Sequence, residues 1–388
     1  MRLAIIGNES KPIPATEGGA VETIIDTFIQ YNEKYINNKI DIYSKYNALS
    51  LKKAKRYRFT RGIYVNLKYQ NSFLIKVNRK LNIINYKKIY INNVIGQMKG
   101  HSYDWIIVEN RPDFVLPLRE AFSDSKIALH MHNEHLTFRT VNAKKIIKAL
   151  NKIIAVSDFI ANKIKSIDIN YAWKVTTLTN RVDINKFAPR YKDNGLCQKF
   201  NIDNQITTIV IHGRIVKEKG ILEAIKAFKV ARQFVSGLKL IIIGDIKNAN
   251  RKYYRLLKEE INKTNNKESI VFTGYVSHNS VPDYLNLSDI ILLPSIWNEP
   301  CSLSILESLA IGKSLITTRT GGTPEIVPNN CGILVKIDNS LVQQLAKDVV
   351  YLAKNKAKRN FYENNARKFA INNLDDRTFY NDFLKILE

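Results

Sequence analysis

Residues 297–325 read WNEPCSLSILESLAIGKSLITTRTGGTPE and decide the fold of the second half of the chain. Two carboxylates, Glu299 and Glu307, lie eight residues apart on either side of Pro300. A proline favours extended backbone at the preceding residue and suits a helix entrance, so we predict a loop at Glu299 and an N-cap at Ser302 or Ser304. Apolar residues at helical spacing follow, which places Glu307 about one turn into the helix.

The space between these two acids suits one class of ligand. Free backbone N–H groups at a helix start attract anions, while carboxylates accept hydrogen bonds from sugar hydroxyls. The segment Cys301, Ser302 and Leu303 would supply the amides. A nucleotide sugar is both anionic and polyhydroxylated, so we predict a nucleotide-sugar site here.

A second motif, HGRIVKEKG over 212–220, follows an apolar run and precedes a helical pattern. Arg214 and Lys219 stand between Gly213 and Gly220, where two cations can hold a diphosphate and neutralise its growing charge. A third motif, Gly18-Gly19-Ala20, opens the first predicted helix and permits close backbone approach to an anion. The dinucleotide motif G-x-G-x-x-G is absent, which argues against a nicotinamide cofactor.

These three motifs occur in the order seen in the family-4 retaining glycosyltransferases, which this chain resembles over nearly its whole length. Residues 299–307 resemble the E-x7-E signature of that family, and 213–220 resemble its diphosphate motif. The resemblance implies the GT-B fold: two Rossmann-like, doubly wound α/β domains facing a central cleft, with a C-terminal helix that crosses back to the first domain.

The resemblance also assigns roles to individual residues. It implies that Glu307 binds the donor ribose, that Glu299 positions the donor sugar, and that His132 stands beside that sugar as a catalytic group with Arg214 and Lys219. We expect Gly18, Gly19, Ala20, Gly213, Cys301, Ser302 and Leu303 to be donor-binding residues. Further candidate cleft residues are Asn180, Arg181, Tyr275 and Glu325. Cys301-Ser302 replaces the aromatic-glycine pair that is usual after Glu-Pro in the family.

No metal or cofactor is expected besides the nucleotide-sugar co-substrate. The sequence contains no Asp-x-Asp, and Cys197, Cys301 and Cys331 lack metal spacing, so we expect reduced thiols. His130 and His132 would share one strand face, but the sequence supplies no clear third ligand. We therefore predict no metal site.

The 388 residues suggest two domains of similar size. We predict an acceptor-binding domain over 1–182, a linker over 183–205, a nucleotide-sugar domain over 206–358 and a terminal helix over 359–388 that packs on the first domain. Strands alternating with helices predict parallel sheets. The predicted strands are Arg2–Gly7, Lys39–Tyr43, Trp105–Glu109, Lys126–His132, Lys152–Ser157, Thr207–His212, Leu238–Gly244, Ser269–Gly274, Ile290–Pro294, Ser314–Thr317 and Gly332–Val335.

The net charge of +25 is concentrated in part of the first domain. Residues 51–100 contain thirteen Lys or Arg and no Asp or Glu, interleaved with aromatic residues. This composition favours an anionic membrane surface, with Lys52, Lys53, Arg56 and Arg58 as contacts; a solvated basic face or a nucleic-acid surface are the alternatives. No nucleic-acid motif accompanies it. The chain start lacks a signal-peptide pattern, so we expect a cytoplasmic protein on the inner face of the membrane.

The sequence thus predicts a retaining hexosyltransferase that moves a sugar from a nucleotide sugar to a lipid-linked glycan in capsule, exopolysaccharide or related surface-glycan synthesis. One alternative is a sugar-nucleotide epimerase on the same fold, which would need no acceptor. Another is a non-catalytic binder of glycans or nucleic acid, which would not need a complete diphosphate site. The sequence does not indicate the donor base, the sugar, the linkage or the oligomeric state.

Overall fold

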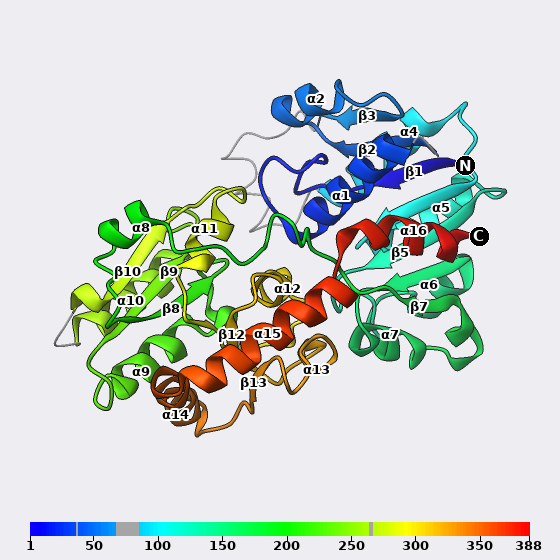
Figure 1. Cartoon of the computed structure of the whole chain (residues 1–388). Helices are drawn as coiled ribbons and strands as arrows, with labels where there is room; N and C mark the ends of the chain where they lie inside the picture. Colours follow the sequence, from blue (N-terminus) through cyan, green and yellow to red (C-terminus); the bar gives the residue numbers. More distant parts are fainter. Residues whose placement is uncertain (36–37, 67–84, 264–266) are drawn as a thin grey trace. The chain divides into compact units, whose positions relative to one another are not determined.

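Apolar runs of Ile, Leu and Val form the strands of two parallel sheets, each flanked by helices (Figure 1). The computed structural model describes residues 1–35, 38–66, 85–263 and 267–388. They divide into unit 1, Met1–Asn180 with Arg377–Glu388, and unit 2, Arg181–Asp376. In these ranges no helix has the length and apolarity needed to cross a membrane.

The sheet of unit 1 has the strand order β3-β2-β1-β4-β5-β6-β7, so the order reverses between β1 and β4. Its strands are β1 (Arg2–Ile6), β2 (Lys39–Lys45), β3 (Thr60–Val65), β4 (Trp105–Glu109), β5 (Lys126–Met131), β6 (Lys152–Ala155) and β7 (Val175–Thr177). Its α-helices are α1 (Ala20–Tyr35), α2 (Ala48–Ala54), α4 (Tyr86–Met98), α5 (Val115–Ala121), α6 (Ala143–Ala149), α7 (Asp158–Lys165) and α16 (Asp376–Leu387).

The sheet of unit 2 has the order β10-β9-β8-β11-β12-β13 and reverses between β8 and β11. Its strands are β8 (Thr207–His212), β9 (Leu238–Ile243), β10 (Ile270–Gly274), β11 (Ile290–Leu293), β12 (Ser314–Thr318) and β13 (Gly332–Val335). Its α-helices are α8 (Asn194–Lys199), α9 (Ile221–Ala231), α10 (Arg251–Asn262), α11 (Val281–Asn286), α12 (Leu303–Ala310), α13 (Thr323–Ile326), α14 (Leu341–Lys354) and α15 (Lys356–Asn373). In such sheets ligands bind outside the carboxyl ends of the strands, at the reversal point.

All eleven predicted strands are present, and the described residues contain two further strands that were not predicted. The edge strand β3 lies within the basic stretch, where Arg61 and Gly62 interrupt the apolar pattern. Its pairing with β2 places Arg61 opposite Asp41, and the guanidinium and carboxylate form two hydrogen bonds of 2.8 and 2.9 Å. The other missed strand, β7, has only three residues.

The segment predicted as a linker, 183–205, belongs to unit 2. Its buried Phe187 and Phe200 have His278 and Tyr284 as ring neighbours. Two ion pairs add to these contacts: Arg190 lies 2.9 Å from Asp283, and Lys192 lies 3.0 Å from Asp289. The boundary between the units falls earlier, between Asn180 and Arg181.

The terminal segment 359–388, predicted as one helix, contains parts of two helices. Helix α15 belongs to unit 2, where the Arg367 guanidinium donates to the carbonyls of Ile184, Phe187 and Ala310. Residues Arg377–Glu388 belong to unit 1. There Tyr380 and Phe383 of α16 pack on Phe28 of α1, with ring centroids 4.9 and 5.1 Å apart. At the break between the two helices, the Leu374 carbonyl accepts from the Val182 N–H at 2.9 Å, and the Asp376 N–H donates to the Val182 carbonyl at 3.2 Å. These two backbone bonds stand in place of helical ones.

Candidate functional site

A hollow that is open to solvent lies at the carboxyl ends of β8 and β11, and the empty space in it, open solvent included, is about 320 Å³. It lies where the strand order of unit 2 reverses, the expected position for a ligand. Its lining combines apolar strand residues with the predicted cations and the start of α12: Ile211, His212, Gly213, Arg214, Lys219, Ile221, Leu293, Ser295, Ser302, Ser304 and Ile305.

Two glycines shape the loop that carries the cations. Gly213 has φ 140° and Gly220 has φ 65°, values that L side chains rarely adopt. A Cβ on Gly220 would lie 1.8 Å from the carbonyl oxygen of Pro294, so only glycine permits this contact with the end of β11. Arg214 is exposed at the hollow, and its guanidinium makes no hydrogen bond or ion pair with another described residue.

Lys219 and Glu299 form an ion pair, with Nζ 2.5 Å from Oε1. The Ser295 hydroxyl donates to the same oxygen at 2.6 Å, and the Glu299 side chain is 5% exposed. Burial by itself raises the pKa of Glu299, but Lys219 and the hydrogen bonds from Ser295 and Trp297 outweigh it and lower that pKa. Glu299 is therefore held ionised, with its charge matched by Lys219.

The glycine pair 321–322 supports the loop of Glu299. A Cβ on Gly321 would lie 2.3 Å from the carbonyl oxygen of Glu299, and the Gly322 N–H donates to that oxygen at 2.7 Å. This pair therefore positions Glu299. Glu325, predicted as a cleft residue, is an exposed residue in the first turn of α13.

Helix α12 begins after Ser302, one of the two predicted N-cap residues, although the Ser302 side chain makes no capping hydrogen bond. The N–H groups of Leu303 and Ser304 have no intrahelical acceptor because they stand in the first turn. Cys301 and Ser302 are buried where the helix begins. Glu307 also lies on this helix, and both of its carboxylate oxygens face histidines.

Sequence reasoning missed both of these histidines. His278 Nε2 lies 2.9 Å from Glu307 Oε1, and His212 Nδ1 lies 3.5 Å from Oε2. Burial lowers the pKa of His212, although Glu307 attracts its charged form. The sequence signal for His212 was its position at the end of a strand. His278 comes three residues after Tyr275, a predicted cleft residue that is exposed in the loop beyond β10.

The glycine loop of unit 1 is tied to the start of α1. Gly18 and Gly19 have φ 65° and 128°. A Cβ on Gly19 would lie 2.0 Å from the Glu22 carboxylate, whose other oxygen accepts from the Asn8 amide at 2.8 Å. Ala20 is the first residue of the helix.

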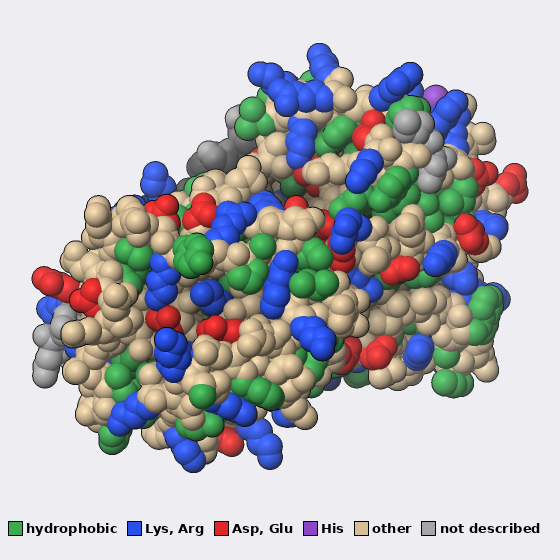
Figure 2. Space-filling model, in the orientation of Figure 1, with side chains coloured by type: hydrophobic (Ala, Val, Ile, Leu, Met, Phe, Trp, Pro, Cys, Tyr) green, Lys and Arg blue, Asp and Glu red, His purple; other side chains and the backbone are tan. Residues whose placement is uncertain are grey.

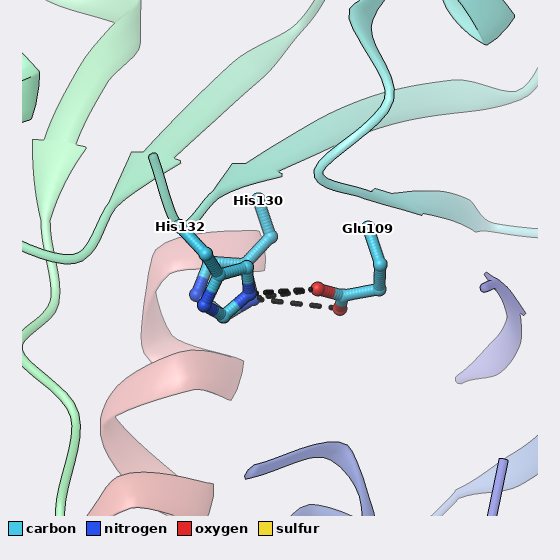
Figure 3. Close-up of side chains that lie close together, drawn as sticks. All are labelled: Glu109, His130 and His132. Carbon is cyan, nitrogen blue, oxygen red and sulfur yellow. Dashed lines mark hydrogen bonds and ion pairs between the residues drawn. The ribbon is translucent and has the colours of Figure 1, made fainter. Parts of the chain in front are cut away.

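A buried cluster of Glu109, His130 and His132 lies at the carboxyl edge of the same sheet (Figure 3). Glu109 ends β4 directly beside His130 of β5. Its Oε2 lies 3.1 Å from His130 Nδ1 and 3.0 Å from His132 Nε2. The two histidines do share one face, as predicted, and Glu109 is the partner that the sequence did not reveal.

The cluster is strongly polarised. Burial by itself raises the pKa of Glu109, but the two histidines have the larger, opposite effect and lower that pKa to about 2. Burial and the neighbouring His130 lower the pKa of His132 to about 4, against the opposing pull of Glu109. Among the described residues these three side chains also form a group whose ligand atoms could hold a metal ion. The stated reason for predicting no metal site, a missing third ligand, is therefore corrected by Glu109.

The basic surface is only partly as predicted. Figure 2 shows Lys and Arg side chains gathered where Figure 1 places α2. Lys52, Lys55, Arg56 and Arg58 are exposed there, whereas the Lys53 ammonium pairs with Asp26 of α1. The missing acids of the stretch are thus supplied in part by other segments. Residues 67–84 of the stretch lie outside the described residues.

The predicted site residues fall into two groups. Gly213, Arg214, Lys219, Glu299, Cys301, Ser302, Leu303 and Glu307 share unit 2, while Gly18, Gly19, Ala20 and His132 share unit 1. Asn180 and Arg181 are the residues on either side of the boundary.

Comparison with known proteins identifies the enzyme class. Residues 196–369 match the family model described as "Glycosyl transferases group 1". Residues 196–369 therefore form a group 1 glycosyltransferase domain. The matched range covers the hollow, the Lys219–Glu299 pair and α12, so the two predicted nucleotide-sugar motifs of unit 2 lie in it, whereas the glycine loop 18–20 lies outside it.

Individual relatives extend the similarity beyond that domain. This glycosyltransferase is 21% identical to spore coat protein SA of Bacillus subtilis, over 100% of the chain and 99% of the relative. It is 27% identical to the UDP-Gal:α-D-GlcNAc-diphosphoundecaprenol α-1,3-galactosyltransferase of Escherichia coli, over 44% of the chain and 41% of the relative. The structure of HepE of Anabaena in complex with UDP-glucose is similar with a TM-score of 0.76 and 17% identity, covering 100% of the chain and 99% of HepE. The glycosyltransferase has the predicted GT-B fold.

Proposed function

We propose that this glycosyltransferase moves one sugar from a nucleoside diphosphate sugar to a lipid-linked glycan, with retention of the anomeric configuration. We place the reaction at the cytoplasmic face of a membrane, in the synthesis of a capsule, an exopolysaccharide or a related surface glycan. The observation that carries the proposal is the hollow of unit 2, in which Arg214, Lys219 and the first turn of α12 converge.

Each part of this site suits one part of the donor. Arg214 and Lys219, with the amides of the first turn of α12, would hold the diphosphate. Glu307 would accept hydrogen bonds from the two ribose hydroxyls, since an ionised carboxylate has several acceptor positions. The structure of HepE with UDP-glucose supports a nucleotide-sugar ligand on this fold.

During transfer the bond between the sugar and the diphosphate breaks, a bond from the sugar to the acceptor hydroxyl oxygen forms, and the proton of that hydroxyl passes to the leaving diphosphate. Negative charge grows on the leaving diphosphate, where Arg214 and Lys219 would stabilise it without a divalent metal. Glu299 would hydrogen-bond the donor sugar. His132 would stand beside the reacting centre, its imidazole oriented by Glu109.

Two observations support a lipid-linked acceptor. The first is the exposed basic surface around α2, which suits anionic lipid headgroups. The second is the similarity to a galactosyltransferase whose name specifies a diphosphoundecaprenol acceptor.

The decisive experiment measures nucleoside diphosphate release from a panel of nucleotide sugars, with and without lipid-linked acceptors. We expect release to depend on both one donor and one acceptor. Conversion of the donor sugar without any acceptor would instead identify an epimerase. Donor binding without turnover on any acceptor would identify a non-catalytic binder.

A further inference from the structure

The carboxylate that we assign to the donor ribose already has partners in this structure. Glu307 Oε1 lies 2.9 Å from His278 Nε2, and Oε2 lies 3.5 Å from His212 Nδ1. The Glu307 side chain is 10% exposed. When a ribose diol approaches Glu307, the Oε1 oxygen of that carboxylate is therefore already hydrogen-bonded to His278.

Lys186 determines which ring nitrogen of His278 carries the proton. The Lys186 ammonium lies 2.9 Å from His278 Nδ1 and 3.1 Å from Asn279 Oδ1. An ammonium group can only donate hydrogen bonds, so Nδ1 must be the acceptor. The proton of the neutral ring then sits on Nε2, which donates to Glu307. Lys186 thus orients His278 as a hydrogen-bond donor toward the carboxylate.

The two histidines differ in how firmly they are held. The His212 side chain is 4% exposed, and its Nε2 contacts the Ser304 carbonyl at 3.1 Å and the Ser308 hydroxyl at 3.2 Å. The His278 side chain is 50% exposed. It stands in the loop between β10 and α11, with Phe187 as a ring neighbour at 5.4 Å. His278 can therefore leave Glu307 by rotating its side chain into solvent, whereas His212 cannot leave without disturbing the core.

We propose that His278, oriented by Lys186, is an affinity-determining residue of the donor site that competes with the ribose hydroxyls for Glu307. This inference rests on the proposed role of Glu307. The hydroxyls replace one neutral N–H donor by two O–H donors on the same carboxylate, so the exchange leaves no buried acceptor unpaired. Removing His278 leaves the carboxylate open to solvent and to the ligand, and donor binding then needs no displacement.

The test is calorimetric binding of UDP, GDP and ADP to the full chain, using whichever of them binds most tightly to the wild type as the probe. We expect His278→Ala to tighten binding at least fivefold. His278→Gln is the matched control: its amide still donates to Glu307, so its Kd should stay within twofold of the wild type. Glu307→Gln should weaken binding at least tenfold.

The double variant His278→Ala/Glu307→Gln separates the two claims. If the competition is for Glu307, the Kd of the double variant equals that of Glu307→Gln alone. Unchanged or weaker binding by His278→Ala, with Glu307→Gln still weakened, would overturn the inference and leave the role of Glu307 intact. Unchanged binding by Glu307→Gln would instead refute the ribose assignment. Equal tightening by His278→Ala with and without Glu307 would also overturn the inference, because the displaced contact would not be the one to that carboxylate.

Discussion

Lys219 Nζ lies 2.5 Å from Glu299 Oε1, so the predicted diphosphate cation and the predicted sugar-binding acid form one unit. The pair explains how an ionised carboxylate can be buried beside a site for an anionic ligand. Lys219 also offsets the charge of Glu299, while the Arg214 side chain, exposed at the same hollow, has no carboxylate partner among the described residues. Loss of Lys219 and loss of Arg214 should therefore have different effects on the free energy of unfolding.

Lys219→Met should destabilise the protein, whereas Arg214→Met should not. Loss of Lys219 leaves a buried, unpaired carboxylate, which costs about 3 kcal/mol of unfolding free energy. Arg214 is exposed, so its replacement should leave stability nearly unchanged. Urea unfolding of both variants measures the difference. The double variant Lys219→Met/Glu299→Gln should recover most of the loss, and a Lys219→Met variant as stable as Arg214→Met would contradict the pairing.

Turnover should fall at least tenfold in Arg214→Met, because a charge that stabilises the leaving diphosphate is removed. Steady-state release of the nucleoside diphosphate measures this at saturating donor and acceptor. Lys217→Met is the matched control, since Lys217 is an exposed cation of the same motif that does not line the hollow. Near-normal turnover of Arg214→Met would exclude the residue from the diphosphate site.

The free energy of unfolding should fall as the pH is lowered, because His132 is protonated more easily in the unfolded chain than in the folded protein. Its pKa is about 4 in the folded protein and about 6.5 when unfolded. Between pH 6.5 and pH 4 the His132 imidazole is protonated in the unfolded chain but neutral in the folded protein. Acidification therefore lowers the free energy of unfolding by about 3 kcal/mol in total. Urea unfolding from pH 7 to pH 4 should show a smaller loss in His132→Asn. His135 and His212 contribute equally to both proteins, so identical slopes would refute a neutral, buried His132.

Transfer should continue in EDTA, because Arg214 and Lys219 supply the positive charge that a divalent metal provides elsewhere. The measurement is turnover after dialysis against EDTA, with Mg²⁺, Mn²⁺ or Zn²⁺ added back. Loss of activity that Mn²⁺ restores would contradict metal-free transfer at the diphosphate. If Zn²⁺ alone restores the activity of the wild type but does not restore that of Glu109→Gln, the cluster of Glu109, His130 and His132 is a metal centre.

The surface around α2 should bind anionic vesicles at low salt. Replacing Lys52, Lys55, Arg56 and Arg58 by Glu should release the protein, since each cation near the surface contributes about 1 kcal/mol. Lys53 is left in place because it pairs with Asp26. Co-sedimentation at low and high salt is the measurement, because screening weakens the attraction.

The matched control for this surface changes the same number of charges in unit 2. Replacing the exposed residues Lys336, Lys347, Lys354 and Lys356 by Glu gives an equal change in net charge. This control should still sediment with the vesicles. Equal release of both variants would reduce the effect to net charge, and a wild type that ignores the vesicles would leave the basic face merely solvated.

The sequence by itself determined the two parallel sheets and the order of the donor motifs. Runs such as Ile290–Leu293 are buried on both faces of a sheet, so their apolar character is readable without a partner. Gly213, Gly220 and the Ser302 helix start are equally local, because backbone conformation and helix entry depend on neighbouring residues. The edge strand β3 escaped prediction because its pairing with β2, and the Asp41 partner of Arg61, come from a distant segment.

Only the tertiary structure decided which charges meet. The contacts Lys219–Glu299, His278–Glu307, Lys53–Asp26 and Glu109–His132 join residues between 23 and 80 positions apart in the chain. Such pairs leave no periodic pattern, since each depends on which strand ends lie side by side in the sheet. The same reason explains the segment 183–205, which has the composition of a linker but belongs to unit 2, where Arg190 and Lys192 pair with Asp283 and Asp289. Residue types thus indicated the chemistry of the site, and the strand order of each sheet decided which charged groups come into contact there.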